Sequence, residues 1–226
     1  MQRESNMTHS VHPYSFRIGI LRDWKSRWFQ HKNFAKFLKE DVEMREWLMK
    51  KLRASLVSGV EIERSRNTVV IYIKTPRPGL LIGRGGEGIE KLKKEIQKKM
   101  NFKDLKVTIE EGRNPYADAH VVARLVTQDL EKRLPFRRVL KSYIEKVMNS
   151  GSAKGVRIEV AGRLDGAEMG RREWLRKGLI PLQTLRADVD FARDRAALPY
   201  GTVGVTVWIY RGEVFDKENE KEKLEK

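Results

Sequence analysis

The stretch LLIGRGGEGIEKLKKEI, residues 80–96, constrains the fold of this chain more than any other segment. Its glycines follow an apolar run and precede a helical pattern, and they allow two interpretations. Gly83, Gly85 and Gly88 spell G-x-G-x-x-G, the pattern of a dinucleotide-binding turn. Residues 83–86 also spell G-x-x-G, the loop with which KH modules clamp single-stranded nucleic acid. The first interpretation predicts an oxidoreductase and the second an RNA-binding protein.

The elements expected around this loop discriminate between the two. Apolar residues recur at helical spacing over Glu40–Leu56, with Val42 on the stripe and Asp41 placed to cap the helix. Two β-rich runs, VEIER and TVVIYIK, then predict an antiparallel hairpin. A short helix leads into the glycine loop, and a helix with one apolar stripe and a strand, LKVTIEE, follow it. The predicted order is α-β-β-α-α-β.

A dinucleotide-binding turn requires a strand immediately before the glycines and a parallel strand after the helix. Here a hairpin precedes the loop, and Pro76 and Pro78 separate the two. The predicted order is instead that of the prokaryotic, type II KH fold. Glycines allow the sugar-phosphate backbone to approach, and the N-terminus of the next helix favours anions. We therefore expect these residues to bind RNA, with Arg84 as the cation inside the loop: Gly83, Arg84, Gly85 and Gly86.

A second domain is expected after the break at residues 112–115. Two helical stretches, Ala117–Arg133 and Phe136–Asn149, are split at Pro135, because proline removes a helical hydrogen bond. Strand-like runs begin at Val156, Leu182 and Val203. The prediction is an α+β protein in which a type II KH domain is followed by a two-layer domain, two helices on a small sheet. The predicted boundaries are an irregular arm at 1–39, the KH domain at 40–112, the second domain at 113–214 and a disordered charged tail at 215–226.

Composition indicates the class of partner. The net charge is +16 and the isoelectric point is near 10.0, so the surface attracts polyanions, with nucleic acid as the first candidate. The longest apolar run, VVIYI, is far shorter than the roughly 20 residues that cross a bilayer. The first ten residues carry no apolar signal segment. The absence of cysteine suits a cytoplasmic location, and the four histidines have no metal-ligand spacing. We expect no metal, no cofactor, no membrane partner and no homo-oligomer.

The first 35 residues interleave aromatic and basic side chains. Arg17, Trp24 and Trp28 lie in the run SFRIGILRDWKSRWFQHKNF. Two roles remain open for them: the aromatics anchor the arm on the domain behind it, or the segment contacts RNA directly. Both roles are compatible, and we keep these three residues as candidate RNA contacts.

Several longer segments carry a family resemblance. SVHPYSFRIGI, PGLLIGRGGEGIEKL, LEKRLPFRRVLK, AGRLDGAEMGRREW, IPLQTLRADVDF and YGTVGVTVWIYRGE resemble the S-three family of small-subunit ribosomal proteins, over about Met7–Val214. The resemblance implies a protein in the head of the small subunit that binds 16S-type rRNA through both domains. It also implies contact with neighbouring small-subunit proteins and a place in the wall of the channel through which mRNA enters.

The resemblance assigns Arg137, Arg138 and Lys141 to that channel, where the family's cations help to unwind structured mRNA. On the helix from Phe136, these cations lie away from the predicted buried stripe, and they would bind phosphate without reading sequence. Further candidate RNA contacts in the second domain are Arg163, Arg171, Arg172, Trp174 and Arg186. For Glu173 we expect an ion pair within the domain.

Three positions depart from the family pattern. Asp165 and Ser15 stand where glycine is usual, and Gln183 stands where histidine is usual. Asp165 places a negative charge in a loop expected to face RNA.

Other functions remain as alternatives. A nicotinamide-dependent enzyme would use the glycine turn, and a free KH regulator of transcription or RNA processing would lack the second domain. No catalytic motif supports an enzyme, so we expect none.

Overall fold

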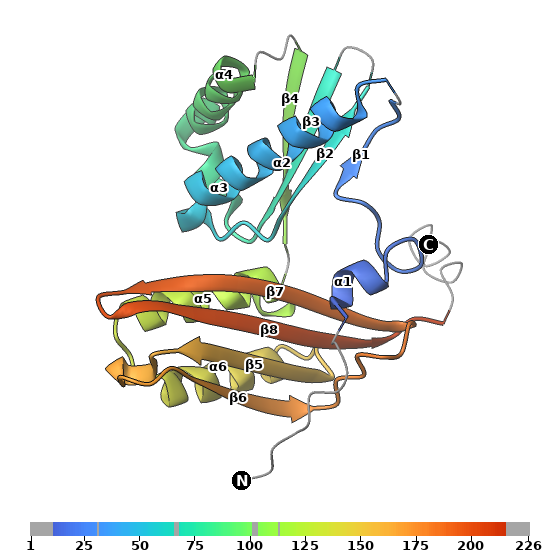
Figure 1. The fold of residues 1–226 in the computed structure, drawn as a ribbon. Helices are drawn as coiled ribbons and strands as arrows, with labels where there is room; N and C mark the ends of the chain where they lie inside the picture. Colours follow the sequence, from blue (N-terminus) through green and yellow to red (C-terminus); the bar gives the residue numbers. More distant parts are fainter. Residues whose placement is uncertain (1–10, 31, 66–67, 101–103, 113, 216–226) are drawn as a thin grey trace.

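The computed structural model describes residues 11–30, 32–65, 68–100, 104–112 and 114–215. Two units, each a sheet covered by helices, are joined by a short linker, and the N-terminal arm runs beside both (Figure 1). The predicted α+β class with two domains is confirmed. The predicted disordered tail lies, apart from Phe215, outside the described residues.

The first unit has the predicted α-β-β-α-α-β order of a type II KH domain. Its sheet runs β1-β2-β3-β4, in which β1 is Ser26–Arg27 of the arm, β2 is antiparallel to β3 and β3 is parallel to β4. Fully buried Ile62, Ile71 and Ile73 face the helices because alternate residues of a strand point to the same side. The elements are α2 (Phe34–Lys51), β2 (Gly59–Arg64), β3 (Thr68–Thr75), α3 (Pro78–Ile82), α4 (Glu87–Met100) and β4 (Asp104–Glu111).

The prediction for the first long helix was wrong in two respects. Helix α2 begins at Phe34 rather than Glu40, so Asp41 lies inside the helix and does not cap it. Met44 is fully buried in the core, whereas Val42 is 40% exposed. The carboxylate of Asp41 is fully buried. It accepts hydrogen bonds from Arg64 Nε and Trp28 Nε1, each at 2.8 Å, and these bonds offset the cost of removing its charge from water. The ion pair of Asp41 with Arg64 joins α2 to β2 within the KH domain, and the hydrogen bond from Trp28 ties the arm to the same carboxylate.

The second unit places two helices on one face of an antiparallel sheet of order β6-β5-β8-β7. The helices break at Pro135 as predicted, and their apolar faces cover Val156, Ile158 and Val207 of the central strands. The elements are α5 (Ala119–Glu131), α6 (Phe136–Asn149), β5 (Gly155–Gly162), β6 (Arg171–Gly178), β7 (Ala187–Leu198) and β8 (Gly201–Glu213).

The predicted sheet of three strands was incomplete. Strand β6 was not predicted, because RREWLRKG forms an edge strand on which no residue is fully buried and apolar alternation is missing. Strand β7 begins at Ala187 rather than Leu182 and continues to Leu198. At a register shift between Asp188 and Val189, Arg211 of β8 is left without a Cα partner on β7, and such a bulge interrupts the period of two in β8.

The arm is more ordered than predicted and contacts both domains. Strand β1 (Ser26–Arg27) pairs parallel to β2 and extends the KH sheet. Helix α1 (Pro13–Phe16) lies against β7. Arg17, the residue after this helix, is only 1% exposed. The Arg17 guanidinium donates to the carbonyl oxygens of Pro181, Leu182 and Thr184 at 3.3, 3.0 and 2.9 Å. The arm is thus fastened at one end to the second domain and at the other to the KH domain.

The linker between the domains is held by one arginine. Arg211 Nη2 donates to the carbonyl oxygen of Ala117 at 2.8 Å, to Asp118 at 2.9 Å and to Asp190 at 3.1 Å. Asp190 also accepts a hydrogen bond from the backbone of Ala119 at 2.9 Å, at the first turn of α5. Burial raises the pKa of Asp190, but the charge of Arg211 and this hydrogen bond outweigh burial and leave the pKa below its usual value. Asp190 is therefore a stable anion at neutral pH.

Replacing Asp41 should destabilise the fold measurably. Asp41→Asn leaves the buried guanidinium of Arg64 without its nearest carboxylate, and we expect a loss of about 3 kcal/mol in the free energy of unfolding, measured in urea. The exposed pair Lys39 and Glu43 provides the control, because Glu43→Gln should change the free energy by less than about 0.5 kcal/mol. Equal effects of the two substitutions would contradict the role of Asp41.

Removing the Arg17 side chain should release the arm from the second domain. Arg17→Ala should raise the rate of trypsin cleavage after Arg22 and Lys25 by roughly tenfold, because cleavage follows local opening. Lys106→Ala, at an exposed position on β4, is the control and should leave that rate unchanged. An unchanged rate in Arg17→Ala would mean that other contacts hold the arm.

Candidate RNA-binding surfaces

The glycine loop joins α3 to α4 through backbone conformations that favour glycine. Gly83, Gly85 and Gly86 have φ angles of 70°, 61° and 84°. Arg84 projects from an exposed position of the loop and has no ion pair within the described residues. The loop thus offers a bare backbone, one unpaired cation and the N-terminus of a 14-residue helix, which together suit a phosphate.

Gly88 explains why the loop resembles a dinucleotide-binding turn. A Cβ atom at this position would lie 2.4 Å from the carbonyl oxygen of Leu81 and 2.9 Å from that of Ile82. The glycine is needed because α4 starts directly against α3, and it does not serve an approaching cofactor. The hairpin before α3 and the two helices after β4 agree with the KH interpretation.

The three cations assigned to α6 lie on its outer face. Arg137, Arg138 and Lys141 are exposed, while the predicted stripe of Leu140, Tyr143, Ile144 and Val147 is buried against the sheet.

Strand β6 brings further charges to the same surface. Glu173 accepts two hydrogen bonds from Arg137, both at 3.2 Å, and forms an ion pair with Arg171 at 3.0 Å. Hydrogen bonding by Arg137, with the charge of that residue and of Arg171, lowers the pKa of Glu173. Both guanidinium groups lie within 6 Å of the Phe136 ring centre, at 5.6 and 5.8 Å. The ion pair expected for Glu173 is confirmed, and it joins α6 to β6.

The opposite face of β6 presents an aromatic ring among cations. Trp174 is 42% exposed, and the Arg157 guanidinium lies 4.7 Å from its ring centre and 5.0 Å from that of Trp208. Arg176 lies 5.7 Å from the Trp174 ring, and Arg172 pairs with Glu159 at 3.1 Å.

Two cations of this face, Arg157 and Arg176, were not predicted as site residues. Arg157 and Arg176 are Cα partners across the β5–β6 ladder, so their proximity depends on the pairing of these two strands. The alternation of Arg172, Trp174 and Arg176 in the sequence was the available signal.

Other predicted contacts serve the fold as well as the surface. Arg163 donates to the carbonyl oxygens of Ala167 and Tyr200, and it thereby holds the turn after β5. Asp165 has a φ angle of 52°, which explains why glycine suits this position; aspartate is among the residues that tolerate this conformation. Arg186 is exposed and donates to Glu213 at 2.7 Å.

The arm residues divide between the two roles that the sequence left open. Arg17 is buried, and its Nη1 and Nη2 groups donate to carbonyl oxygens, so the structure favours the anchoring role for this residue. Trp28 is half-buried between Phe34 and Phe37 and serves as an anchor. Trp24 is 63% exposed and remains a candidate contact.

No grouping of three or more potential ligands placed to share a metal ion occurs in the described part of the chain. Among its helices, none has the length and apolar character needed to cross a bilayer.

Comparisons with known proteins agree with this division into two domains. The family model for the KH domain matches residues 43–115. The model described as "Ribosomal protein S3, C-terminal domain" matches residues 126–209.

Curated relatives match along most of the chain. "Small ribosomal subunit protein uS3" of Xanthomonas euvesicatoria pv. vesicatoria is 46% identical over 211 residues, 93% of this chain and 86% of the relative. The uS3 protein of Anaeromyxobacter is 45% identical over 92% of both chains. That of Lawsonia intracellularis is 45% identical over 95% of this chain and 100% of its own length. The chain therefore belongs to the uS3 family and is a structural component of the small subunit of the cytoplasmic ribosome.

Proposed function

We propose that the chain binds 16S-type rRNA through both domains and lines the channel through which mRNA enters the small subunit. There it helps to hold and unwind mRNA during translation. The observation that carries this proposal is a group of exposed cations on α6: Arg137, Arg138 and Lys141. On β6, Glu173 pairs with both Arg137 and Arg171, so the charged surface continues onto this strand.

The chemistry of the α6 surface suits a strand that moves. Arginine and lysine bind phosphate oxygens without reading bases, so mRNA of any sequence is held alike. Glu173 fixes the direction of Arg137, which therefore loses little conformational entropy when it meets a phosphate. The helix itself is anchored by its buried stripe, so the cations keep their spacing while the strand passes.

The remaining surfaces suit stationary RNA. The KH loop offers backbone and Arg84 to one phosphate, and the Trp174 face offers a ring on which an unpaired base stacks. These contacts account for rRNA binding by each domain. Trp24, Arg163, Arg172 and Arg186 lie exposed, at positions that add to these surfaces.

Unwinding by this chain requires no nucleotide-hydrolysing site of its own. The glycine loop lacks the Gly-Lys-Ser/Thr end of a P-loop, and Ile89 follows its last glycine. We propose that translocation by the ribosome supplies the force while the cations hold the separated strand. ATP hydrolysis by the purified chain would contradict this proposal.

Neutralising the α6 cations should weaken binding of single-stranded RNA in a salt-dependent manner. For the triple substitution Arg137→Ala, Arg138→Ala and Lys141→Ala, the slope of log affinity against log salt should fall by about 2, since each phosphate contact contributes about 0.7. Filter binding of poly(U) by the purified chain measures the slope.

A control and a second readout accompany this triple variant. Lys32→Ala, Lys36→Ala and Lys39→Ala together remove the same charge from exposed positions and should leave the slope nearly unchanged. Small subunits that carry the α6 variant should translate an mRNA with a stable hairpin more slowly, and an unstructured mRNA at the normal rate. Equal slowing of both messages would contradict a role in unwinding.

Arg84 should contribute one phosphate contact. Arg84→Ala should lower the same salt slope by about 0.7 and leave the unfolding midpoint unchanged, because the side chain is exposed. Lys98→Ala, on the same domain, is the matched control. If Arg84→Ala binds RNA as the unmodified chain does, the loop is not a phosphate site in this protein.

A further inference from the structure

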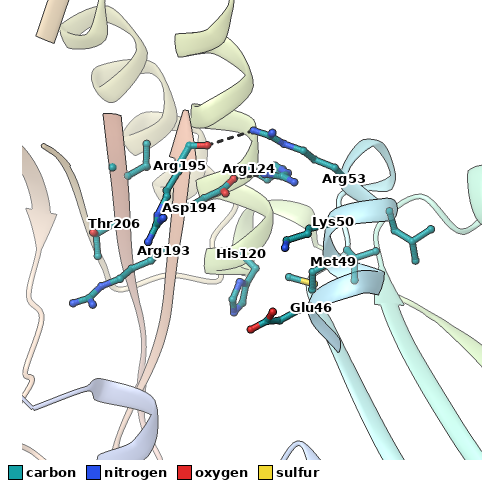
Figure 2. A pocket seen from close by; sticks show the side chains of 14 residues that line it. Glu46, Met49, Lys50, Arg53, His120, Arg124, Arg193, Asp194, Arg195 and Thr206 are labelled. Atoms are coloured by element: carbon teal, nitrogen blue, oxygen red, sulfur yellow. Dashed lines mark hydrogen bonds and ion pairs between the residues drawn. The ribbon is translucent and has the colours of Figure 1, made fainter. Parts of the chain in front are cut away.

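A cavity of about 820 Å³ separates the two domains on one side of the molecule. It lies between α2 of the KH domain and α5, β7 and β8 of the second domain, and its size is that of pockets that hold small ligands or peptide segments. Figure 2 shows Glu46, Met49 and Lys50 extending from α2 toward His120 of α5, with Arg193 and Arg195 on the far wall.

The floor of the cavity is aliphatic. It is formed by Leu52, Val57 and Val205, which are at most 8% exposed, together with the half-buried Met49. Among the described residues that line it, the imidazole of His120 is the one aromatic ring. The floor therefore suits aliphatic side chains and lacks the rings on which bases stack.

The rim carries an excess of positive charge. Two of its cations have internal partners, since Arg124 pairs with Asp194 at 2.6 Å and Arg53 pairs with Glu131 at 2.5 Å. Three further cations line the cavity without an ion pair within the described ranges of the chain: Lys50, Arg193 and Arg195.

Phe191 and His120 lie near these cations, and neither reduces the excess of positive charge. Arg193 stacks over Phe191 at 5.2 Å, which occupies the face of the guanidinium and leaves its N–H edge available. Burial and the charge of Lys25 lower the pKa of His120, and the carboxylates of Asp190 and Asp194 do not reverse this effect, so its imidazole is neutral near pH 7. Glu46 and Asp194 are the acidic residues of the lining.

We propose that this cavity binds a segment of a neighbouring small-subunit protein in which carboxylates stand beside aliphatic side chains. The aliphatic groups would cover the floor, and the carboxylates would pair with Lys50, Arg193 and Arg195. An RNA strand fits less well, because its regularly spaced phosphates would meet Glu46 and Asp194, and its bases would find no Phe, Tyr or Trp ring and a single half-buried imidazole, that of His120. The inference rests on membership of the uS3 family and is independent of the proposed RNA contacts.

Site-specific photo-cross-linking in assembled small subunits tests the proposal. The full chain, with the photoreactive amino acid p-benzoyl-phenylalanine in place of Met49, is incorporated in cells, and purified small subunits are irradiated. Mass spectrometry of the cross-linked peptide should identify one ribosomal protein, with Asp or Glu within a few residues of the cross-linked position. The same amino acid in place of Met169, which is 81% exposed and outside the cavity, is the control and should not cross-link to that peptide.

Charge reversal then tests the carboxylate contact. Arg193→Glu with Arg195→Glu, both at exposed positions of β7, should lower the cross-link yield at least tenfold, whereas Lys36→Glu with Lys39→Glu should not change it. Cross-linking mainly to rRNA, a peptide without acidic residues, or a yield insensitive to charge reversal would each overturn the proposal. Because every sample is a purified subunit containing the chain, these outcomes are distinct from a failure of the mRNA-binding proposal.

Discussion

The contact between Arg211 and Asp190 fixes how the two domains meet. Arg211 holds the linker at Ala117 and Asp118, and Asp190 receives the first turn of α5, so the KH domain leaves the second domain in one direction only. The arm repeats this constraint on another side, where Arg22 pairs with Asp188 at 2.7 Å and β1 joins the KH sheet. The glycine loop, α6 and the cavity between the domains depend on this arrangement for their relative positions.

Acidic residues within the cationic surfaces act as positioning groups. Glu173 directs Arg137 and Arg171, Glu159 holds Arg157 and Arg172, and each carboxylate lies on a strand. A charged side chain that is already oriented loses less entropy on binding than a free one. The net charge of +16 gives only the number of cations, whereas strands and helices fix the positions of the cations on these surfaces.

The sequence predicted the KH domain well because its signals are local. Hairpin alternation, the glycine loop and one apolar stripe each lie within about 20 residues, and all three were found where expected. The errors came from long-range contacts. Aspartate is a common residue at the N-terminus of a helix. Only the hydrogen bonds that Asp41 accepts from Arg64 and Trp28 explain why it is buried inside α2. The burial of Arg17 and strand β6 were not predicted for the same reason: a buried cation and a polar edge strand depend on partners far along the chain.

Strand β6 has a consequence for the chain before it joins a ribosome. Its outer edge is unpaired within the described fold, and an exposed edge is a template for pairing between copies of a protein. Cations at Arg171, Arg172, Arg176 and Lys177 line that edge, so two copies that approach edge to edge repel each other. The side chains that we propose as RNA contacts therefore also oppose edge-to-edge pairing between copies of the free protein.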